Sequence, residues 1–140
     1  MTRFKTVFLI DDDVDDRDIF ALALTEIDDS IACVTASDGI DALSRLRDRS
    51  FTPDYIFLDL NMPRMNGKQC LSAMKGEPRL QHVPIIIYTT SSEHQDITET
   101  LELGASDFLT KPTRISELTE RLRFVLTKYG YTNKDAVSPS

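Results

Sequence analysis

The stretch Val7–Asp16, "VFLIDDDVDD", places four apolar residues directly before three adjacent carboxylates. An apolar run without alternation is typical of a strand that is buried on both faces of a parallel sheet. At an effective dielectric constant near 20, two carboxylates ~6 Å apart repel each other by roughly 3 kcal/mol. A cluster of this kind weakens the fold unless a positive charge lies beside it. The stretch therefore predicts a buried strand that ends at a cation-binding edge.

The rest of the chain alternates short apolar runs with amphipathic segments. This alternation predicts strands at residues 7–10, 31–35, 55–58, 85–88 and 107–109, and helices at residues 15–26, 39–47, 67–75, 95–103 and 115–129. The last helix is the clearest, because its apolar residues recur at i, i+3 and i+4 spacing. Gly104 follows the fourth helix, where a left-handed cap is common. Five strand–helix units in this order predict an α/β fold, a doubly wound five-stranded parallel sheet with helices on both faces and right-handed crossovers.

Length and composition limit the class of protein. The chain has 140 residues, enough for one domain, and is 41% hydrophobic and 28% charged. Its net charge of −7 argues against nucleic acid or an anionic membrane as the main partner. No apolar run approaches the roughly 20 residues of a membrane span, and no signal-peptide pattern is present, so we expect a cytoplasmic protein. Cys33 and Cys70 are isolated in the sequence, which indicates reduced packing thiols.

The aperiodic end of the chain defines the expected domain boundary. After Tyr129 the sequence "GYTNKDAVSPS" has no hydrophobic periodicity and mixes Gly, Asn, Ser and Pro. We therefore expect one folded domain at residues 1–129 and a flexible C-terminal tail at residues 130–140.

Chemically useful side chains follow four of the five predicted strands. In doubly wound folds, ligands bind at the carboxyl ends of the strands. The residues at those ends are Asp11, Asp12 and Asp13 after the first strand, Asp59 after the third, Thr89, Thr90 and Ser91 at the fourth, and Lys111 after the fifth. Carboxylates, a hydroxyl and an ammonium group at one edge suit a hard divalent cation and a phosphoryl group, and Mg²⁺ takes one or two carboxylates with water and phosphate oxygens. The acids of the opening stretch would then be neutralised by the metal and the lysine.

The same residues give the chain a close resemblance to the response-regulator receiver domains of bacterial two-component signalling, over residues 5–129. The most specific motif is "DLNMPRMNG" at residues 59–67, in register with the acidic pair, "TT" at residues 89–90 and "KP" at residues 111–112. The resemblance implies a flavodoxin-like strand order of 2-1-3-4-5. Within the family, "KGEPRLQHVPIIIYTTS" at residues 75–91 resembles the single-domain receivers that pair with bacterial phytochrome kinases.

The resemblance implies a role for each site residue. Asp11 and Asp12 match the acidic pair that holds Mg²⁺, and the backbone carbonyl of Asn61 matches a further metal ligand. Asp59 matches the aspartate that accepts the phosphoryl group and also contacts the metal. The remaining matches are the switch hydroxyl Thr89, the switch aromatic Phe108 and the phosphate-pairing lysine Lys111.

The implied function is signalling rather than turnover catalysis. Asp59 would take a phosphoryl group from a phosphohistidine on a sensor histidine kinase or phosphotransfer protein, and the chain would catalyse only its own phosphorylation and dephosphorylation. The surface of the fourth helix, fifth strand and fifth helix would then change shape and contact a downstream protein. Whether the same surface also pairs two copies into a homodimer stays open. Whether the chain is a diffusible regulator or a relay intermediate stays open.

Two finer expectations follow from the resemblance. The Lys111–Pro112 bond is predicted to be cis, because the strand must turn sharply to aim the ammonium group. Thr90 stands where many relatives have Ala or Gly, so its side chain should narrow access to the phosphoryl site and alter dephosphorylation.

Plainer interpretations exist for several of these residues. Carboxylates in a first helical turn are favoured by the helix dipole, so Asp13, Asp15, Asp16 and Asp18 need no functional role. Asp13 is expected either to cap the helix or to support the metal ligands without contacting the metal. Phe108 could be an ordinary core residue, although its position before Lys111 favours the switch role. A pseudo-receiver without phosphorylation is disfavoured because every site position is filled.

Two rival functions conflict with the sequence. A calcium loop beginning at Asp11 requires Gly and Glu where Asp16 and Leu22 stand. A haloacid-dehalogenase-type phosphatase requires an aspartate at position 61, where the chain has Asn61.

Overall fold

The computed structural model describes residues 5–132. Its strands are β1 (Thr6–Ile10), β2 (Ala32–Ala36), β3 (Tyr55–Leu58), β4 (Ile85–Thr89) and β5 (Asp107–Thr110). Its helices are α1 (Val14–Ile27), α2 (Gly39–Leu46), α3 (Gly67–Lys75), the short 3₁₀ helix η1 (Pro78–Leu80), α4 (His94–Glu102) and α5 (Ile115–Lys128). All ten predicted elements are present with small shifts at their ends, and η1 was not predicted.

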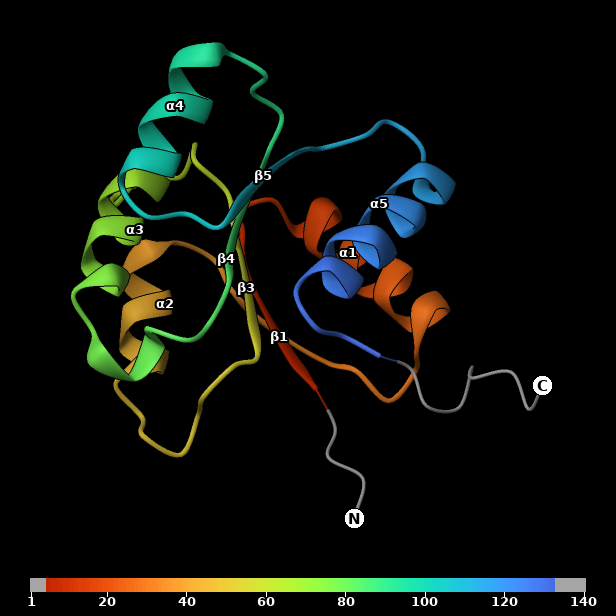
Figure 1. The fold of residues 1–140 in the computed structure, drawn as a ribbon, viewed down its shortest axis with the longest axis horizontal. Helices are drawn as coiled ribbons and strands as arrows, with labels where there is room; N and C mark the ends of the chain where they lie inside the picture. The colour runs from red at the N-terminus through yellow and green to blue at the C-terminus, as the bar shows by residue number, and fades with distance from the viewer. Residues whose placement is uncertain (1–4, 133–140) are drawn as a thin grey trace.

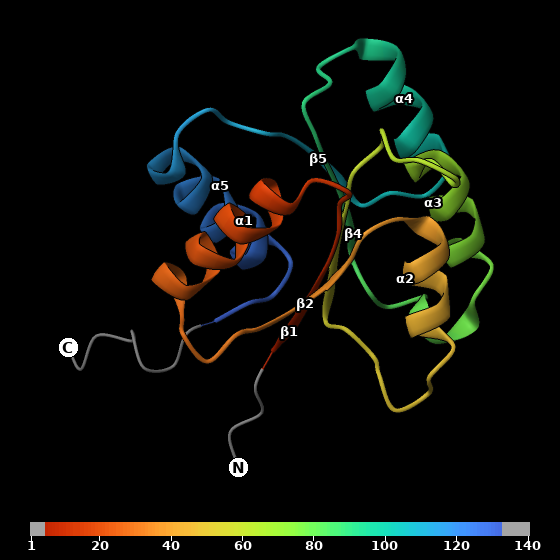
Figure 2. The ribbon, with the colours of Figure 1, turned by 180° about the vertical axis from the view of Figure 1, so that it is seen from behind.

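The strands form one parallel sheet in the order β2-β1-β3-β4-β5, which confirms the expected order. Helices α1 and α5 lie on one face of the sheet, and α2, α3 and α4 lie on the other (Figures 1 and 2). Because every strand pair is parallel, all five carboxyl ends lie at one edge of the sheet, beside the start of α1. No helix in the described part of the chain is both long and apolar enough to cross a membrane.

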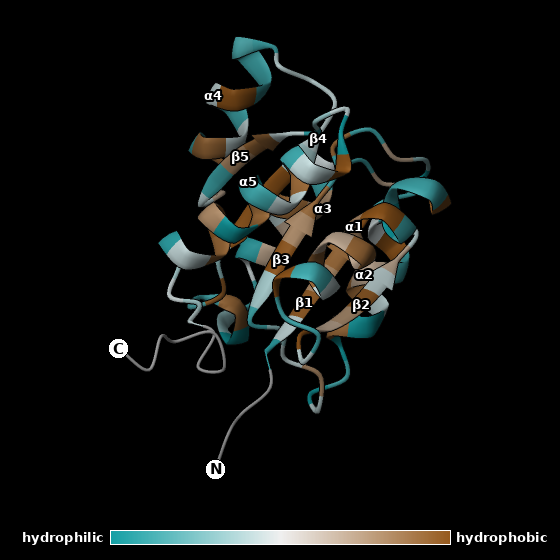
Figure 3. Cartoon of the chain, turned by 90° about the vertical axis from the view of Figure 1, so that its right-hand side faces the viewer, coloured by the Kyte–Doolittle hydropathy of each residue, from teal (hydrophilic) through white to brown (hydrophobic). Residues whose placement is uncertain are grey.

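The sheet separates two hydrophobic cores, and this explains why its strands lack polar alternation. In β1, Val7 and Leu9 join the core beneath α1 and α5, whereas Phe8 and Ile10 join the core beneath α2 and α3. All four side chains are fully buried. The hydropathy colouring shows brown, apolar strands between helices of mixed colour (Figure 3). The four-residue apolar run of the opening stretch thus reflects burial on both faces.

Side-chain caps fix where several helices begin. Asp13 caps α1 as expected, because its carboxylate accepts a hydrogen bond from the Asp16 backbone N–H. Asn66 and Gln69 form a reciprocal capping box at the start of α3. After α4, Gly104 has φ +107°, which confirms the predicted left-handed position.

The packed part of the chain extends slightly past the predicted domain end. Tyr131 is 4% exposed, and its N–H donates to the Leu126 carbonyl at 2.9 Å. Its hydroxyl donates to Asp28 at the end of α1. Residues 130 and 131 therefore belong to the fold, and residues 133–140 of the predicted tail lie outside the described residues.

Both cysteines are free thiols, as expected. Burial raises the pKa of the Cys33 thiol to about 11 and, with a smaller effect of Asp38, that of Cys70 to about 12. Both thiols therefore stay protonated at neutral pH, which suits a packing role.

Gly67, the first residue of α3, lies against the backbone that follows β3. A Cβ atom at this position would lie 2.2 Å from the Asp59 carbonyl oxygen and 2.6 Å from the Leu60 Cα. The Gly67 N–H donates to the Leu60 carbonyl at 2.8 Å. Only a residue without a side chain allows α3 to begin this close to Asp59.

We expect Gly67→Ala to lower the free energy of unfolding by about 2–3 kcal/mol, because backbone must shift to admit the methyl group. The matched control is Gly76→Ala at the other end of α3. There a Cβ would lie 3.5 Å from the Ala73 carbonyl oxygen, and φ is −81°. This control should raise the free energy of unfolding by about 0.4–1 kcal/mol. Urea unfolding of the two variants measures both values, and equal effects would contradict the close-contact explanation.

Candidate functional site

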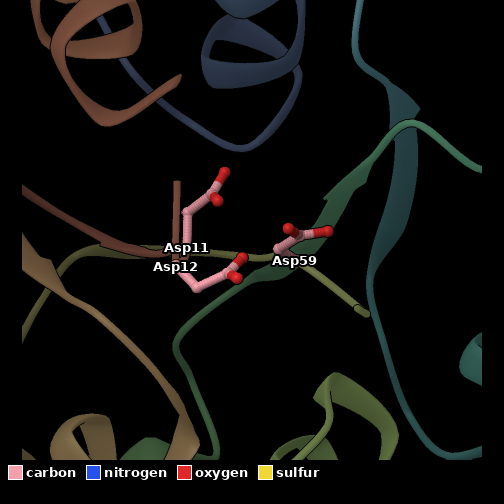
Figure 4. A group of neighbouring side chains, drawn as sticks. All are labelled: Asp11, Asp12 and Asp59. Carbon is pink, nitrogen blue, oxygen red and sulfur yellow. The ribbon is translucent and has the colours of Figure 1, made fainter. Parts of the chain in front are cut away.

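Three carboxylates meet at the carboxyl edge of the sheet. One oxygen from each of Asp11, Asp12 and Asp59 lies within 4.8 Å of the others. Asp11 is fully buried and Asp59 is 6% exposed, whereas Asp12 is exposed. The Asp12 carboxylate points toward Asp59, and that of Asp11 points toward the helices above it (Figure 4).

Strand register places Asp11 beside Asp59. Ile10 of β1 pairs with Leu58 of β3, so the next residue of each strand lies at the same level. The Asp59 N–H donates to the Ile10 carbonyl at 2.9 Å, and the Asp11 N–H donates to the Ala36 carbonyl at 3.0 Å. The backbone thus fixes both acids, and their proximity does not depend on side-chain flexibility.

Lys111 supplies the positive charge that the sequence predicted. Its Nζ lies 2.7 Å from Asp11 and 3.4 Å from Asp59, and its side chain is 8% exposed. The Tyr88 ring lies below it, with 5.3 Å between Nζ and the ring centroid. The Lys111 N–H donates to the Thr89 carbonyl at 2.7 Å, continuing the pairing of β4 with β5.

The predicted cis bond at Lys111–Pro112 is wrong. None of the peptide bonds in residues 5–132 is cis. The hydrogen bond to Thr89 and the length of the lysine side chain bring the ammonium group to the acids with a trans bond, so the sharp turn that motivated the prediction is not needed.

Burial and ion pairing act in opposite directions on these groups. Burial raises the pKa of Asp11 to about 6, although the hydrogen bond from Lys111 opposes the shift. Burial alone would lower the pKa of Lys111, but its bonds to Asp11 and Asp16 outweigh that effect and raise the pKa. Lys111 is therefore charged at neutral pH. The raised pKa of Asp11 lies close to neutral pH, so a cationic neighbour favours its ionised form.

Asp16 is a contact that the sequence analysis missed. Its carboxylate lies 2.7 Å from Lys111 Nζ, as close as that of Asp11. The helix dipole was a sufficient explanation for an acid in the first turn of α1, so no contact was predicted for Asp16. Asp16 lies five residues after Asp11, in a helix that begins at the site, and this position could have indicated the contact.

Thr89 and Phe108 lie on the same face of the sheet. Ile87 pairs with Phe108 in the register of β4 and β5, and Thr89 is the next residue of β4 on that face. Thr89 is fully buried, and within residues 5–132 its Oγ1 is the one buried side-chain oxygen or nitrogen without a hydrogen-bond partner. Phe108 is half-buried and packs against the core beneath α2 and α3. A buried hydroxyl without a hydrogen-bond partner is uncommon, and it can donate to an acceptor on a group that binds at the site.

The loop after Asp59 is held by its own contacts. Arg64 has φ +64°, and its guanidinium donates to Asp38, the cap of α2, with Nε at 3.0 Å. Asn61 is exposed, as is Thr90, the residue after β4. The role of the Asn61 carbonyl and the effect of Thr90 on dephosphorylation stay predictions.

The donors fit a hard divalent cation. All three clustered side chains offer carboxylate oxygens, and one of them is exposed, which leaves an open side for water or phosphate oxygens. The Thr89 hydroxyl, which has no hydrogen-bond partner among the described residues, lies at the end of the neighbouring strand β4. The site therefore combines anionic oxygen ligands, a fixed ammonium group and a free hydroxyl.

Known proteins share this architecture. The family model described as "Response regulator receiver domain" matches residues 7–123. The phosphate regulon transcriptional regulatory protein PhoB of Pseudomonas aeruginosa is 32% identical over 132 residues, which cover 94% of this chain and 56% of that protein. The chain thus spans about half the length, or less, of the curated relatives it first matches.

Two cyanobacterial proteins are similar over more of their length. The crystal structure of the phosphorylated cyanobacterial phytochrome response regulator RcpA has a TM-score of 0.84 and 28% identity, covering 99% of this chain and all of that one. Response regulator Rcp1 of Synechocystis is 29% identical over 121 residues, 81% of each chain. Its Mn²⁺-bound form has a TM-score of 0.80 and 25% identity, with 97% of this chain and 99% of that one covered.

The family match covers the strands that deliver Asp11, Asp59 and Lys111 to one edge of the sheet, together with most of the helices around them. This chain belongs to the response regulator receiver domain family of two-component signalling proteins.

Proposed function

We propose that this chain accepts a phosphoryl group on Asp59 from a sensor histidine kinase or phosphotransfer protein, in a Mg²⁺-dependent reaction. The observation that carries the proposal is the convergence of three carboxylates within 4.8 Å of one another, with the Lys111 ammonium beside two of them. Support comes from two similar proteins, the phosphorylated RcpA and the Mn²⁺-bound Rcp1.

The transfer needs charge stabilisation more than covalent assistance. A carboxylate oxygen of Asp59 forms a bond to phosphorus while the P–N bond of the donor phosphohistidine breaks, and the electron pair stays on the imidazole nitrogen. Asp11, Asp12, Asp59 and the carbonyl of Asn61 would hold the Mg²⁺, which when bound supplies positive charge at the phosphoryl oxygens. Lys111, whose Nζ lies 3.4 Å from Asp59, would supply a second positive charge.

The product can be sensed through Thr89 and Phe108. A phosphoryl oxygen on Asp59 would give the Thr89 hydroxyl the acceptor it lacks, drawing the end of β4 inward. Phe108, on the same sheet face, would then fill the vacated space and change the surface of α4, β5 and α5. This is a shift between two packings that is biased by a local charge change.

The same surface is the proposed contact for a downstream protein or a second copy of the chain. Phe124 of α5 is 70% exposed, and it lines a 380 Å³ hollow with Phe108 and Leu109 of β5. Because the phosphoryl group stays on the protein until it is hydrolysed, the chain would act as a signalling protein and not as a turnover enzyme.

Incubation with a small acyl phosphate and Mg²⁺ tests the proposal directly. We expect intact mass spectrometry to show an adduct of about 80 Da, the mass of HPO₃, on the wild type. The adduct should be lost without the metal and in Asp59→Asn. Asp18→Asn, an exposed α1 variant with the same charge change, should keep it. An adduct on Asp59→Asn would contradict the assignment, and continuous hydrolysis of a small phosphate ester would instead support a phosphatase.

Magnesium should stabilise the fold in proportion to its binding. At a Mg²⁺ concentration of 100 times its dissociation constant, we expect the free energy of unfolding to rise by about 2.7 kcal/mol. Asp12→Asn removes an exposed ligand with little disturbance of packing, so it should lose most of this rise. Thermal unfolding with and without Mg²⁺ measures the effect, and an unchanged response in Asp12→Asn would remove this residue from the proposed ligands.

Thr89→Val separates the hydroxyl from the shape of the side chain. The variant removes a buried hydroxyl without a partner, so the unphosphorylated protein should be more stable by about 1 kcal/mol. Phosphorylation of the variant should still occur, but it should no longer change the NMR signals of the Phe108 ring. Thr89→Ser keeps the hydroxyl and serves as the control. Loss of stability in Thr89→Val, or an unaltered Phe108 response, would argue against the proposed switch.

A further inference from the structure

The Lys111 ammonium group is shared unequally among three carboxylates. Its Nζ lies 2.7 Å from Asp11 and from Asp16, and 3.4 Å from Asp59. An ammonium group has three N–H donors, so two short bonds fix the direction of the third. The lysine is therefore held closest to Asp11 and Asp16, and its contact with the proposed phosphoacceptor Asp59 is the longest of the three.

Asp16 differs from the other two partners. Asp11 and Asp59 belong to the proposed metal-binding group, whereas Asp16 does not. Its side chain is 34% exposed, so burial does not force the contact with Lys111. A cation bound by Asp11 and Asp59 would compete with the lysine for both of those carboxylates, which leaves Asp16 as the partner that stays with it.

Asp16 is held in place by the loop that carries the acidic pair. Its backbone N–H donates to the Asp13 carboxylate at 3.0 Å, and the Asp13 N–H donates to the Asp11 carboxylate at 3.0 Å. Arg17, the next residue of α1, donates to the Asp11 carbonyl at 2.8 Å. The first turn of α1 is thus fixed relative to Asp11, and so is the Asp16 carboxylate that reaches Lys111.

We propose that Asp16 is a positioning residue that retains the Lys111 ammonium group when a divalent cation binds to Asp11, Asp12 and Asp59. Two cations close together repel each other, and a carboxylate outside the metal group relieves that repulsion by keeping the lysine at a fixed distance. Asp16 would thereby let the metal and the lysine act on the phosphoryl group together. This inference rests on the metal site of the proposed function.

Neighbouring aspartates provide a matched test. We expect Asp16→Asn to weaken Mg²⁺ binding about tenfold, because the lysine loses the partner that holds it away from the metal. Asp15→Asn makes the same charge change on an adjacent, exposed residue of α1. It should weaken binding less than about threefold, through long-range charge alone. Asp16→Glu keeps the charge and should recover most of the affinity. Isothermal titration calorimetry with Mg²⁺ alone, without any phosphoryl donor, measures all three variants.

A double-mutant cycle with Lys111→Met tests whether Asp16 acts through the lysine. In the Lys111→Met background, Asp16→Asn should change Mg²⁺ affinity no more than Asp15→Asn does, because no ammonium group needs to be held. An equal tenfold loss in both backgrounds would overturn the inference, and so would equal effects of Asp15→Asn and Asp16→Asn in the wild type. A wild type that binds no Mg²⁺ would instead refute the metal site of the proposed function.

Discussion

The ion pairing of Lys111 with Asp11, Asp16 and Asp59 is the interaction on which the candidate site depends. Asp11 and Asp59 follow neighbouring buried strands, and the backbone leaves them no room to separate. Burying two carboxylates side by side destabilises a fold unless a cation accompanies them. The lysine comes from a strand at the far end of the order, through the pairing of β5 with β4. Correct pairing of four strands, β1, β3, β4 and β5, is therefore a condition for neutralising the acids.

The same arrangement explains why a metal ion can be accepted without rebuilding the site. One carboxylate of the group, Asp12, is already exposed, while the other two are held by backbone hydrogen bonds. A divalent ion would thus meet two carboxylates on a fixed backbone and one that faces solvent. Preorganisation of this kind limits the conformational entropy that binding must remove.

Sequence patterns predicted the parts of the molecule that depend on local rules. The apolar runs fixed the strands because burial on both faces removes polar residues from them. The residues after those runs then defined the site, since parallel strands end at one edge. In the same way, Asp13 was predicted as a helix cap, and Gly104 as a left-handed residue, from composition near helix ends.

The features that were not predicted from the sequence depend mainly on contacts between residues that are far apart in the chain. Asp16 was explained by the helix dipole, and its contact with Lys111 depends on how α1 lies against the segment between β5 and α5. The trans bond before Pro112 follows from the path of that segment. Helix η1 is a single turn with a proline at its start and has no periodicity to detect. Tyr131 lies beyond the last periodic residue, and only its contacts with α1 and α5 place it in the core.

The buried Thr89 hydroxyl limits how far its own hydrogen bonding can shift the populations of two conformations. Leaving such a group without a partner costs about 1–3 kcal/mol, which corresponds to a population ratio of roughly 5 to 150 between two conformations. Moving a population from 1:99 to 99:1 requires about 5.5 kcal/mol. A hydrogen bond to this one oxygen would thus shift the population of the two conformations only in part. A nearly complete shift requires further free energy from a binding partner or from rearranged charges.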